Sequence, residues 1–326
     1  MESRILPQLG YTLRTISVSR LKGGGLIGRL AGLVRVPVAM YQSWRIMASL
    51  KPQIVLGVGG YASGPTLLAA WLSFRRTAIQ EQNATPGFTN RVLSRIAKKI
   101  FVGFSAARKH FKEVKVLETG NPLRQSVRQS LEGQTHRNFS NAGSMRILIF
   151  GGSQGARFLN ERVPQVVEAL KERRPGLALC IRHQTGVHDL EETRKRYEST
   201  GLAPDTWTVT AYIDDMASAY ADADLAITRA GALTIAELMA VGMPSLLVPF
   251  PYAADNHQEA NARSLLEHGA CHMVRQDDWK EGEIVDWLAV LSDDREKLEK
   301  MSRAARGEAR LDAALTIVDH LEELAA

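Results

Sequence analysis

Short runs of β-branched and other apolar residues alternate with longer amphipathic segments along most of this chain. In the first 121 residues, the short runs predict strands at 12–18, 53–58, 77–80, 99–103 and 114–118. The longer segments repeat their apolar positions with a helical period and predict helices at 26–50, 63–74 and 87–98. Strands that alternate with helices are typical of a parallel sheet covered by helices, so we expect an α/β fold.

The same alternation continues in the second half, with strands predicted at 145–150, 178–182, 207–210, 225–228, 245–248 and 271–274. Between the halves, residues 120–144 show neither period and are rich in Gln, Ser, Asn and Arg. We therefore predict a first domain at 1–121, a linker at 122–144 and a second domain at 145–326 that includes the terminal helices. A length of 326 residues agrees with two domains.

The charge is distributed unevenly between these halves. The whole chain carries +6, but residues 1–121 hold 18 Lys and Arg against 4 Asp and Glu, a balance of +14, and the remainder balances at −8. The basic half is expected to meet nucleic acid, a phosphorylated substrate or an acidic membrane face. The start, MESRILPQLG, has no apolar signal region, and no apolar stretch is long enough for a spanning helix, so a cytoplasmic location is expected.

Two glycine-rich turns follow predicted strands, one in each half. The strand at 53–58 leads into GVGGYASGP (57–65), where Ser63 is a candidate helix cap, and the strand at 145–150 leads into GGSQGA (151–156). Glycines at such a turn let the backbone approach an anion, and the following helix N-terminus offers unpaired N–H groups. Two such turns in corresponding places favour phosphate binding over close packing alone.

An oxidoreductase is the alternative interpretation of the first turn. Gly57-x-Gly59-x-x-Ala62 also fits the dinucleotide-binding fingerprint, and Glu81 follows at about the expected distance. That fingerprint usually lies on the first strand of its unit, whereas many residues precede this one, and the second glycine turn has no place in such a scheme.

The segments TRAGALTIAEL (228–238) and PFPYAADNHQEANA (249–262) contain the densest group of polar side chains. Small residues after a strand open another helix N-terminus, where Thr234 is placed to cap the helix or to bind a phosphate oxygen. Glu237 would accept two hydrogen bonds from a ribose diol, or be a carboxylate stabilised by the helix dipole, and spacing leaves both open.

Other polar and sulfur-containing residues are assigned structural roles. Asp222-x-Asp224 resembles a metal-binding carboxylate motif but is interpreted as a loop and cap pair, and His183 is expected on the surface. Cys180 and Cys271 have no metal-ligand spacing and are predicted to be small core residues.

Seven segments together resemble one known family. These are GVGGYASGP, EQNATPGFTNR (81–91), TGNPLR (119–124), GGSQGA, YIDDM (212–216), RAGALTIAEL and DNHQEANA. They are similar to the MurG family, the undecaprenyl-diphospho-muramoylpentapeptide β-N-acetylglucosaminyltransferases. The resemblance implies the GT-B fold, with two Rossmann-like domains facing each other across a cleft. It also implies transfer of GlcNAc from UDP-GlcNAc to the C4 hydroxyl of lipid I to give lipid II, with inversion and without a metal or other cofactor.

The resemblance also implies roles for particular residues. Those expected to bind UDP-GlcNAc are Asn83, Arg124, Ser153, Ile213, Ala232, Leu233, Thr234, Glu237 and Gln258. Those expected to face the acceptor diphosphate are Gly59, Gly60, Tyr61 and Ser63. Proteins of cell-wall synthesis and division are expected as partners, and nucleic acid is not.

The family pattern begins further upstream than this sequence does. Family members start with a strand and a glycine loop of the form GGTGGH, whose His is a proposed catalytic base, whereas this sequence starts within a later segment at Met1-Glu2-Ser3-Arg4. The first strand, loop and helix are therefore expected to be missing here, which leaves the catalytic base unassigned and predicts low activity and an exposed sheet edge. The alternative is a catalytically impaired relative that binds UDP-sugar or serves as a scaffold.

A peripheral position on the inner membrane follows from the basic half. Residues 26–47 mix apolar side chains with arginines, and Trp71, Leu72 and Phe74 precede Arg75 and Arg76. An apolar patch with arginines at its edge would bind the anionic cytoplasmic leaflet. For Trp71 itself, packing in the core is the favoured expectation.

Overall fold

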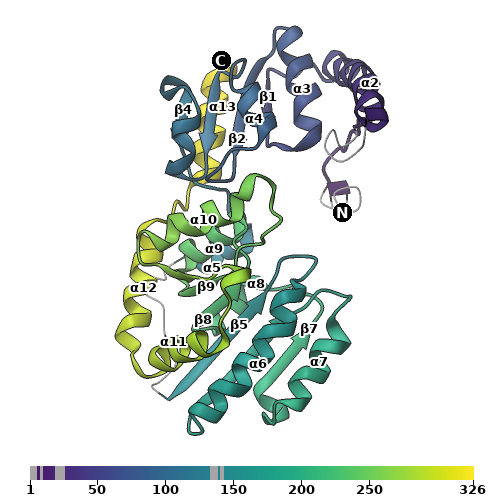
Figure 1. The fold of residues 1–326 in the computed structure, drawn as a ribbon. Helices are drawn as coiled ribbons and strands as arrows, with labels where there is room; N and C mark the ends of the chain where they lie inside the picture. The colour runs from purple at the N-terminus through teal and green to yellow at the C-terminus, as the bar shows by residue number, and fades with distance from the viewer. Residues whose placement is uncertain (1–5, 8–9, 19–25, 133–138, 140–142) are drawn as a thin grey trace. The chain divides into compact units, whose positions relative to one another are not determined.

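The computed structural model describes the chain except residues 1–5, 8–9, 19–25, 133–138 and 140–142, and the side chains of residues 26–36 also lie outside the description. The chain divides into two compact units, which we describe separately (Figure 1). Unit 1 consists of Met1–Gln82, Pro86–Glu118 and Leu315–Ala326, and unit 2 consists of Asn83–Thr85 and Thr119–Ala314.

Unit 1 is built on a parallel sheet with the strand order β1-β2-β3-β4. Its strands are β1 (Ile54–Gly57), β2 (Arg76–Glu81), β3 (Lys99–Val102) and β4 (Val116–Glu118). Its α-helices are α2 (Leu26–Leu50), α3 (Gly60–Leu72), α4 (Phe88–Leu93) and most of α13 (Ala313–Ala325), with short 3₁₀ turns at Ser105–His110 and Glu113–Lys115. The predicted helix at 26–50 is confirmed, but residues 12–18 form no strand, because alternation alone does not supply a neighbouring strand to pair with.

The two faces of this sheet bury different helices. Leu67 of α3 packs with Ile79 and Ile100 on one face, and Ile317 of α13 packs with Ala78 and Phe101 on the other. The last twelve residues therefore belong to unit 1, whereas the sequence assigned them to the second domain. The apolar face of α13 matches a sheet face far away in sequence, which periodicity alone cannot reveal.

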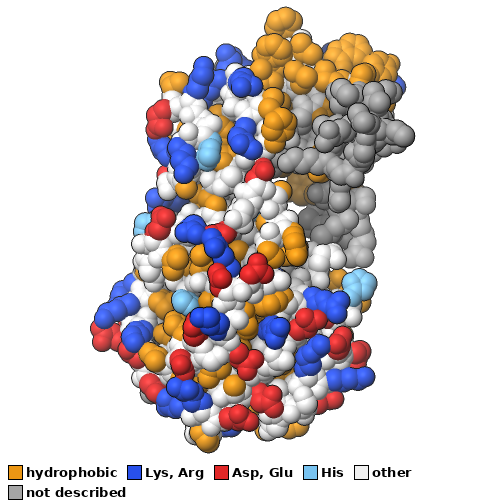
Figure 2. All heavy atoms as spheres, in the orientation of Figure 1, with side chains coloured by type: hydrophobic (Ala, Val, Ile, Leu, Met, Phe, Trp, Pro, Cys, Tyr) orange, Lys and Arg blue, Asp and Glu red, His pale blue; other side chains and the backbone are white. Residues whose placement is uncertain are grey.

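Apolar side chains also remain exposed on unit 1. Among the described side chains of α2 these are Val38, Tyr41, Trp44 and Leu50, and at the end of α3 they are Trp71, Leu72 and the following Phe74. Figure 2 shows hydrophobic side chains gathered where Figure 1 places α2 and α3. Trp71 is 47% exposed, so the expectation that it packs in the core is wrong.

Unit 2 contains a six-stranded parallel sheet with the order β10-β9-β8-β5-β6-β7. Its strands are β5 (Ser144–Phe150), β6 (Ala178–Gln184), β7 (Trp207–Thr210), β8 (Leu225–Thr228), β9 (Ser245–Leu247) and β10 (Cys271–Met273). Its α-helices are α5 (Gln125–Ser130), α6 (Arg157–Arg173), α7 (Leu190–Ser199), α8 (Met216–Asp222), α9 (Ala232–Val241), α10 (His257–Leu266), α11 (Glu281–Asp293) and α12 (Arg295–Gly307). Three 3₁₀ turns accompany them, at Pro204–Thr206, Ala254–Asn256 and Gln276–Asp278.

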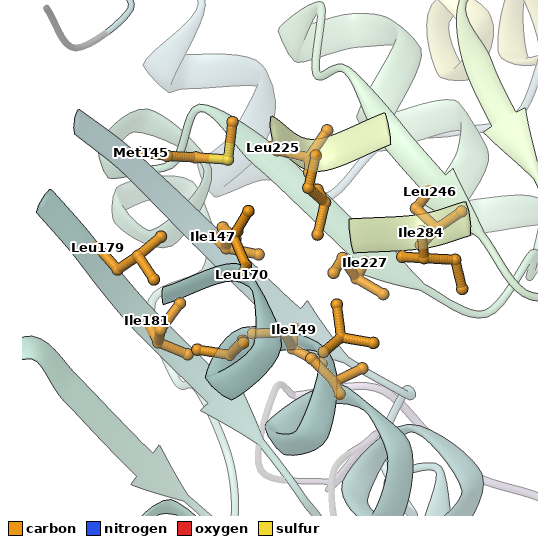
Figure 3. Packing of buried hydrophobic residues seen from close by; sticks show 14 of the residues in the cluster. Met145, Ile147, Ile149, Leu170, Leu179, Ile181, Leu225, Ile227, Leu246 and Ile284 are labelled. Atoms are coloured by element: carbon orange, nitrogen blue, oxygen red, sulfur yellow. The ribbon is translucent and has the colours of Figure 1, made fainter. Parts of the chain in front are cut away.

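The central strands of this sheet carry the core of unit 2. Alternate residues Ile147 and Ile149 of β5 pack beside Ile227 of β8 and against Leu170 of α6 and Ile284 of α11 (Figure 3). Because all neighbouring strands of this sheet are parallel, their carboxyl ends lie at one edge of the sheet, where the following helices begin.

Three sequence interpretations in unit 2 are corrected. The predicted linker contains α5, whose Val127 is fully buried. His183 is also fully buried, with its ring nitrogens 3.0 Å from Tyr197 Oη and from Asn160 Oδ1, and burial lowers its pKa to about 3. Cys180 is exposed and Cys271 is buried, so one of the two predicted core cysteines lies on the surface. His183 and Cys180 both lie on β6 and point to different sides of it, whereas α5 packs on α8 and α9.

Candidate functional site

The order of strands in unit 2 creates a point where the chain direction across the sheet reverses. After β5 the chain runs outward through β6 and β7, and it then returns to the other side of β5 to form β8. Open α/β sheets bind ligands at the carboxyl ends of strands at such a switch point. The two helices that begin beside it are α6 after β5 and α9 after β8, so two N-termini lie at adjacent strand ends.

The turn between β5 and α6 requires its glycines. Gly152 and Gly155 have φ values of 86° and 74°, a region that L side chains rarely adopt. A Cβ atom on Gly155 would lie 1.8 Å from the carbonyl oxygen of Thr185. The cap residue of α6 is Ala156, whose methyl group cannot accept a hydrogen bond. The backbone N–H groups there are left for an anion, and Ser153 is exposed in the same turn.

The turn between β8 and α9 has the same design. Gly231 is the cap residue, so no side chain covers the first N–H groups of α9. Ala232, Leu233 and Thr234 form the first turn of that helix, with Leu233 exposed and Thr234 partly exposed. The structure thus brings these three predicted residues to the switch point together.

Glu237 lies one turn further along α9 and has two polar partners. Arg124 precedes α5, and its Nε is 2.7 Å from Glu237 Oε1 while its Nη2 donates to Oε2 at 3.1 Å. The Tyr220 hydroxyl of α8 donates to Oε2 at 3.0 Å. Burial raises the pKa of Glu237, opposed by the Arg124 charge and the two sets of hydrogen bonds. Two residues predicted separately for the donor site are therefore an ion pair in this structure.

A cavity of about 440 Å³ lies beside the turn between β5 and α6, and Arg229 is one of the residues that line it. The Arg229 guanidinium donates to the carbonyl oxygens of Val248 and Pro249 and lies 5.9 Å and 5.5 Å from the ring centres of Phe158 and Phe250. Burial lowers its pKa to about 10, so it remains positive at neutral pH. Arg229 is not among the residues predicted for the site, although its position directly after the buried strand β8 is a usable signal.

Gln258 and Asn83 approach the same region from two other segments. Gln258 lines the cavity, and its Oε1 accepts from the backbone N–H groups of Ala230 and Phe250, at 3.2 Å and 2.9 Å. The Nε2 end of its amide is the end that can donate to a ligand. Asn261, which is fully buried, donates to Asn83 Oδ1 at 3.1 Å and to the Ala230 carbonyl at 3.2 Å. Asn261 was not predicted, and it ties residues 83–85 to unit 2.

Ile213 follows β7 and is half-buried. Gln184 links Ala211, two residues before Ile213, to the glycine turn after β5. Its Nε2 donates to the Ala211 carbonyl at 3.0 Å, and its Oε1 accepts from Gly151 N–H at 3.3 Å. The segment that carries Ile213 is therefore coupled to the start of the turn that carries Ser153.

The predicted acceptor turn lies in unit 1, at the carboxyl end of β1. Gly59 and Gly60 have φ values of 86° and 75°, and Tyr61 is 50% exposed. Ser63 does not cap the helix as expected, because α3 already begins at Gly60 and the Ser63 hydroxyl donates back to the Gly59 carbonyl at 2.5 Å. The turn presents backbone N–H groups and a tyrosine ring to solvent.

Glu81 ends β2, the strand beside β1, as the dinucleotide fingerprint requires, but its carboxylate is bound within the protein. It is buried, and its Oε2 accepts from Asn90 Nδ2 at 2.8 Å and from Gly87 N–H at 3.2 Å. The carboxylate therefore holds the start of α4, which argues against the oxidoreductase interpretation.

Asp224 is a structural residue in the described part of the chain. It is fully buried, and its carboxylate accepts from the backbone N–H and from the guanidinium of Arg146.

Among the residues that the structure describes, no group of three or more His, Cys, Asp or Glu residues is arranged to hold a metal ion. In the same set of residues, no helix combines the length and apolar character that crossing a bilayer requires.

Family models match both halves of the chain and define its class. The glycosyltransferase family 28 N-terminal domain matches residues 1–102, and the family 28 C-terminal domain matches residues 146–317. With two parallel α/β sheets, these matches establish a glycosyltransferase of the GT-B fold.

Individual relatives narrow this class. The chain is 44% identical over 324 residues to the UDP-N-acetylglucosamine--N-acetylmuramyl-(pentapeptide) pyrophosphoryl-undecaprenol N-acetylglucosamine transferase of Anaeromyxobacter dehalogenans, covering 99% of this chain and 82% of that protein. The protein of that name from Geobacter metallireducens is 42% identical, covering 98% and 86%. The crystal structure of Acinetobacter baumannii MurG superposes with a TM-score of 0.77 at 34% identity, covering 99% and 88%. The chain belongs to the MurG family.

Proposed function

We propose that this protein transfers GlcNAc from UDP-GlcNAc to the C4 hydroxyl of the lipid-linked muramoyl-pentapeptide, as the names of its relatives describe for them. The structural observation that carries this proposal is the meeting of two uncapped helix N-termini at the switch point of unit 2, with the Glu237 carboxylate one turn inside α9. N-termini of this kind suit a diphosphate, and a carboxylate suits a ribose diol. A non-catalytic scaffold is not favoured, because the relatives with the transferase name match 99% or 98% of the chain.

The donor would lie across the carboxyl edge of the unit 2 sheet. Ile213 would contact the uracil, Glu237 would accept from the ribose hydroxyls, and Ser153 with the Ala232–Thr234 turn would meet the diphosphate. Gln258 would donate its Nε2 to the sugar, and Asn83 and Arg124 would complete the donor contacts. The acceptor diphosphate would meet the N–H groups of the turn that carries Gly59, Gly60, Tyr61 and Ser63.

The reaction is proposed to be a single displacement with inversion. A base removes the proton of the acceptor C4 hydroxyl, the oxygen attacks the anomeric carbon, and the bond from that carbon to UDP breaks. Two helix dipoles and the buried Arg229 cation would stabilise the negative charge that develops on the diphosphate. These groups supply positive charge without a metal ion.

The direct test measures donor binding and transfer. UDP-GlcNAc is titrated by calorimetry in the presence of EDTA, and radiolabelled GlcNAc transfer to a lipid-linked muramoyl-pentapeptide is followed separately. We expect binding without metal, and loss of at least about tenfold in affinity for Glu237→Gln, the effect of removing a hydrogen bond to a charged group. Binding of NADH in place of UDP-GlcNAc would overturn the proposal.

We also propose that unit 1 binds the anionic cytoplasmic face of the membrane. The exposed apolar residues of α2 and α3 support this, with Arg45 and Arg75 close to them in sequence. Arg76 is a weaker candidate than the sequence suggested, because its guanidinium donates to the Leu324 carbonyl in the same unit. Each basic residue near an anionic surface contributes about 1 kcal/mol.

Vesicle flotation tests this surface. The double variant Trp44→Glu with Phe74→Glu should lose binding to vesicles that contain anionic phosphatidylglycerol. The control is Val114→Glu, which adds one carboxylate, against two in the double variant, at a residue of unit 1 that is 88% exposed and precedes β4, at the sheet edge opposite β1. Equal binding by both variants, or binding that does not depend on anionic lipid, would contradict the membrane proposal.

A further inference from the structure

Tyr220 is a buried tyrosine whose hydroxyl reaches the candidate nucleotide site. Its side chain is 1% exposed, and its ring packs edge to face with Phe150, the last residue of β5, at 6.0 Å between ring centres. Its hydroxyl lies 3.0 Å from Glu237 Oε2. The phenol is thus fixed between the strand that leads to the glycine turn and the carboxylate of α9.

The oxygens of Glu237 have limited room for further hydrogen bonds. A carboxylate offers about four acceptor positions. Three groups already lie against the carboxylate of Glu237: Arg124 Nε is 2.7 Å from Oε1 in the ion pair, and Arg124 Nη2 and the Tyr220 hydroxyl donate to Oε2. Two ribose hydroxyls require two positions, so at least one present donor has to leave when a nucleotide binds.

The two partners differ in their freedom to leave. The Arg124 side chain is 55% exposed, so its guanidinium can exchange Glu237 for water or for phosphate oxygens. Tyr220 is buried, so its hydroxyl cannot exchange Glu237 for bulk water as the Arg124 guanidinium can. Burial and the Glu237 charge also raise the pKa of Tyr220 well above its ordinary value, so the hydroxyl keeps its proton and remains a donor.

We propose that Tyr220 is a positioning residue for nucleotide recognition, which holds Glu237 Oε2 in place while Arg124 releases the carboxylate to the ribose hydroxyls. This inference rests on the proposed function, which assigns the ribose to Glu237. Tyr220 does not touch the nucleotide. It fixes the orientation of the carboxylate, so its effect is confined to ligands that carry the ribose hydroxyls.

The test compares UDP with 2′,3′-dideoxy-UDP, which lacks both hydroxyls. Tyr220→Phe keeps the ring packing and removes the hydrogen bond. We expect the preference for UDP over the dideoxy nucleotide to fall by roughly tenfold in calorimetric titrations, with affinity for the dideoxy nucleotide unchanged. The matched control is Tyr197→Phe, because Tyr197 is equally buried in unit 2 and its hydroxyl bonds His183 instead. This control should keep the wild-type preference.

A double-mutant cycle separates this inference from the proposed function. If Glu237→Gln abolishes the preference for UDP and Tyr220→Phe adds nothing in that background, Tyr220 acts through Glu237. If Glu237→Gln abolishes the preference but Tyr220→Phe keeps it, the positioning role is wrong and the ribose assignment stands. If Glu237→Gln keeps the preference, the ribose assignment fails, and the role of Tyr220 fails with it. A Tyr220→Phe variant that loses affinity equally for both nucleotides has a merely structural role, which also overturns the inference.

Discussion

The Arg124 side chain holds both oxygens of Glu237, with Nε 2.7 Å from Oε1 and Nη2 3.1 Å from Oε2. Arg124 directly precedes α5 and Glu237 lies in α9, and both residues belong to unit 2. A carboxylate that is 3% exposed keeps its charge more easily beside a guanidinium, because burial alone favours the neutral acid. This pair therefore links the ionisation of the candidate ribose site to the residue that precedes α5.

Nucleotide affinity should depend on pH through Glu237. Burial raises the pKa of Glu237, so the carboxyl takes up its proton at a higher pH than an ordinary glutamate does. UDP affinity should therefore fall as the pH falls through that raised value. Arg124→Met removes the charge that lowers the pKa, and we expect it to move this acid limb to higher pH, as measured by titrating UDP at a series of pH values. An acid limb that is the same in Glu237→Gln as in the wild type would assign it to another group.

Gly155→Ala should destabilise unit 2. Its φ of 74° disfavours alanine, and the new Cβ would collide with the Thr185 carbonyl. We expect the free energy of unfolding to fall by about 1–3 kcal/mol, the cost of one strained residue, as measured by urea denaturation. Gly176→Ala is the control, since a Cβ there meets no atom within 4 Å. Equal stability of both variants would mean that the turn does not need a glycine at 155.

Asn261→Ala should reduce both stability and donor affinity. Asn261 is fully buried, accepts from Ala84 N–H at 2.8 Å and donates to Asn83 Oδ1 and to the Ala230 carbonyl. Loss of these bonds leaves buried backbone groups unpaired, at a cost of about 1–3 kcal/mol. The KM for UDP-GlcNAc should rise because Asn83 and the start of α9 lose a common partner. The exposed Gln129→Ala serves as control, and an unchanged KM in Asn261→Ala would show that residues 83–85 do not contribute to the donor site.

Asp224→Asn should weaken the fold without creating a metal requirement. The buried carboxylate pairs with Arg146, whose side chain is 33% exposed, so we expect a loss of about 2–3 kcal/mol in unfolding experiments. The kcat of the folded variant should match that of the wild type, with and without EDTA. Restoration of activity by added Mn²⁺ would instead support the metal-carboxylate interpretation of Asp222 and Asp224.

The sequence indicated most of the strands because their signal is local. Strands such as β5 and β8 are short apolar runs between turns, and the helix at 26–50 follows from its own period. The predictions that failed depended on a packing or pairing partner elsewhere in the chain, which a local pattern does not identify. Residues 12–18 have a strand-like composition without a strand to pair with, and α13 packs on a sheet face from the other end of the chain.

By itself the sequence determined the α/β class, the two glycine turns and the family, because these depend on residue types at short spacing. It also named Arg124 and Glu237 separately as candidate donor residues. The tertiary structure decided that these two side chains pair, that Tyr220 completes the group, and that Asn261 joins residues 83–85 to the start of α9. Such contacts arise from strand order and helix packing, which bring together Arg124 and Glu237, 113 positions apart, and Asn83 and Asn261, 178 positions apart.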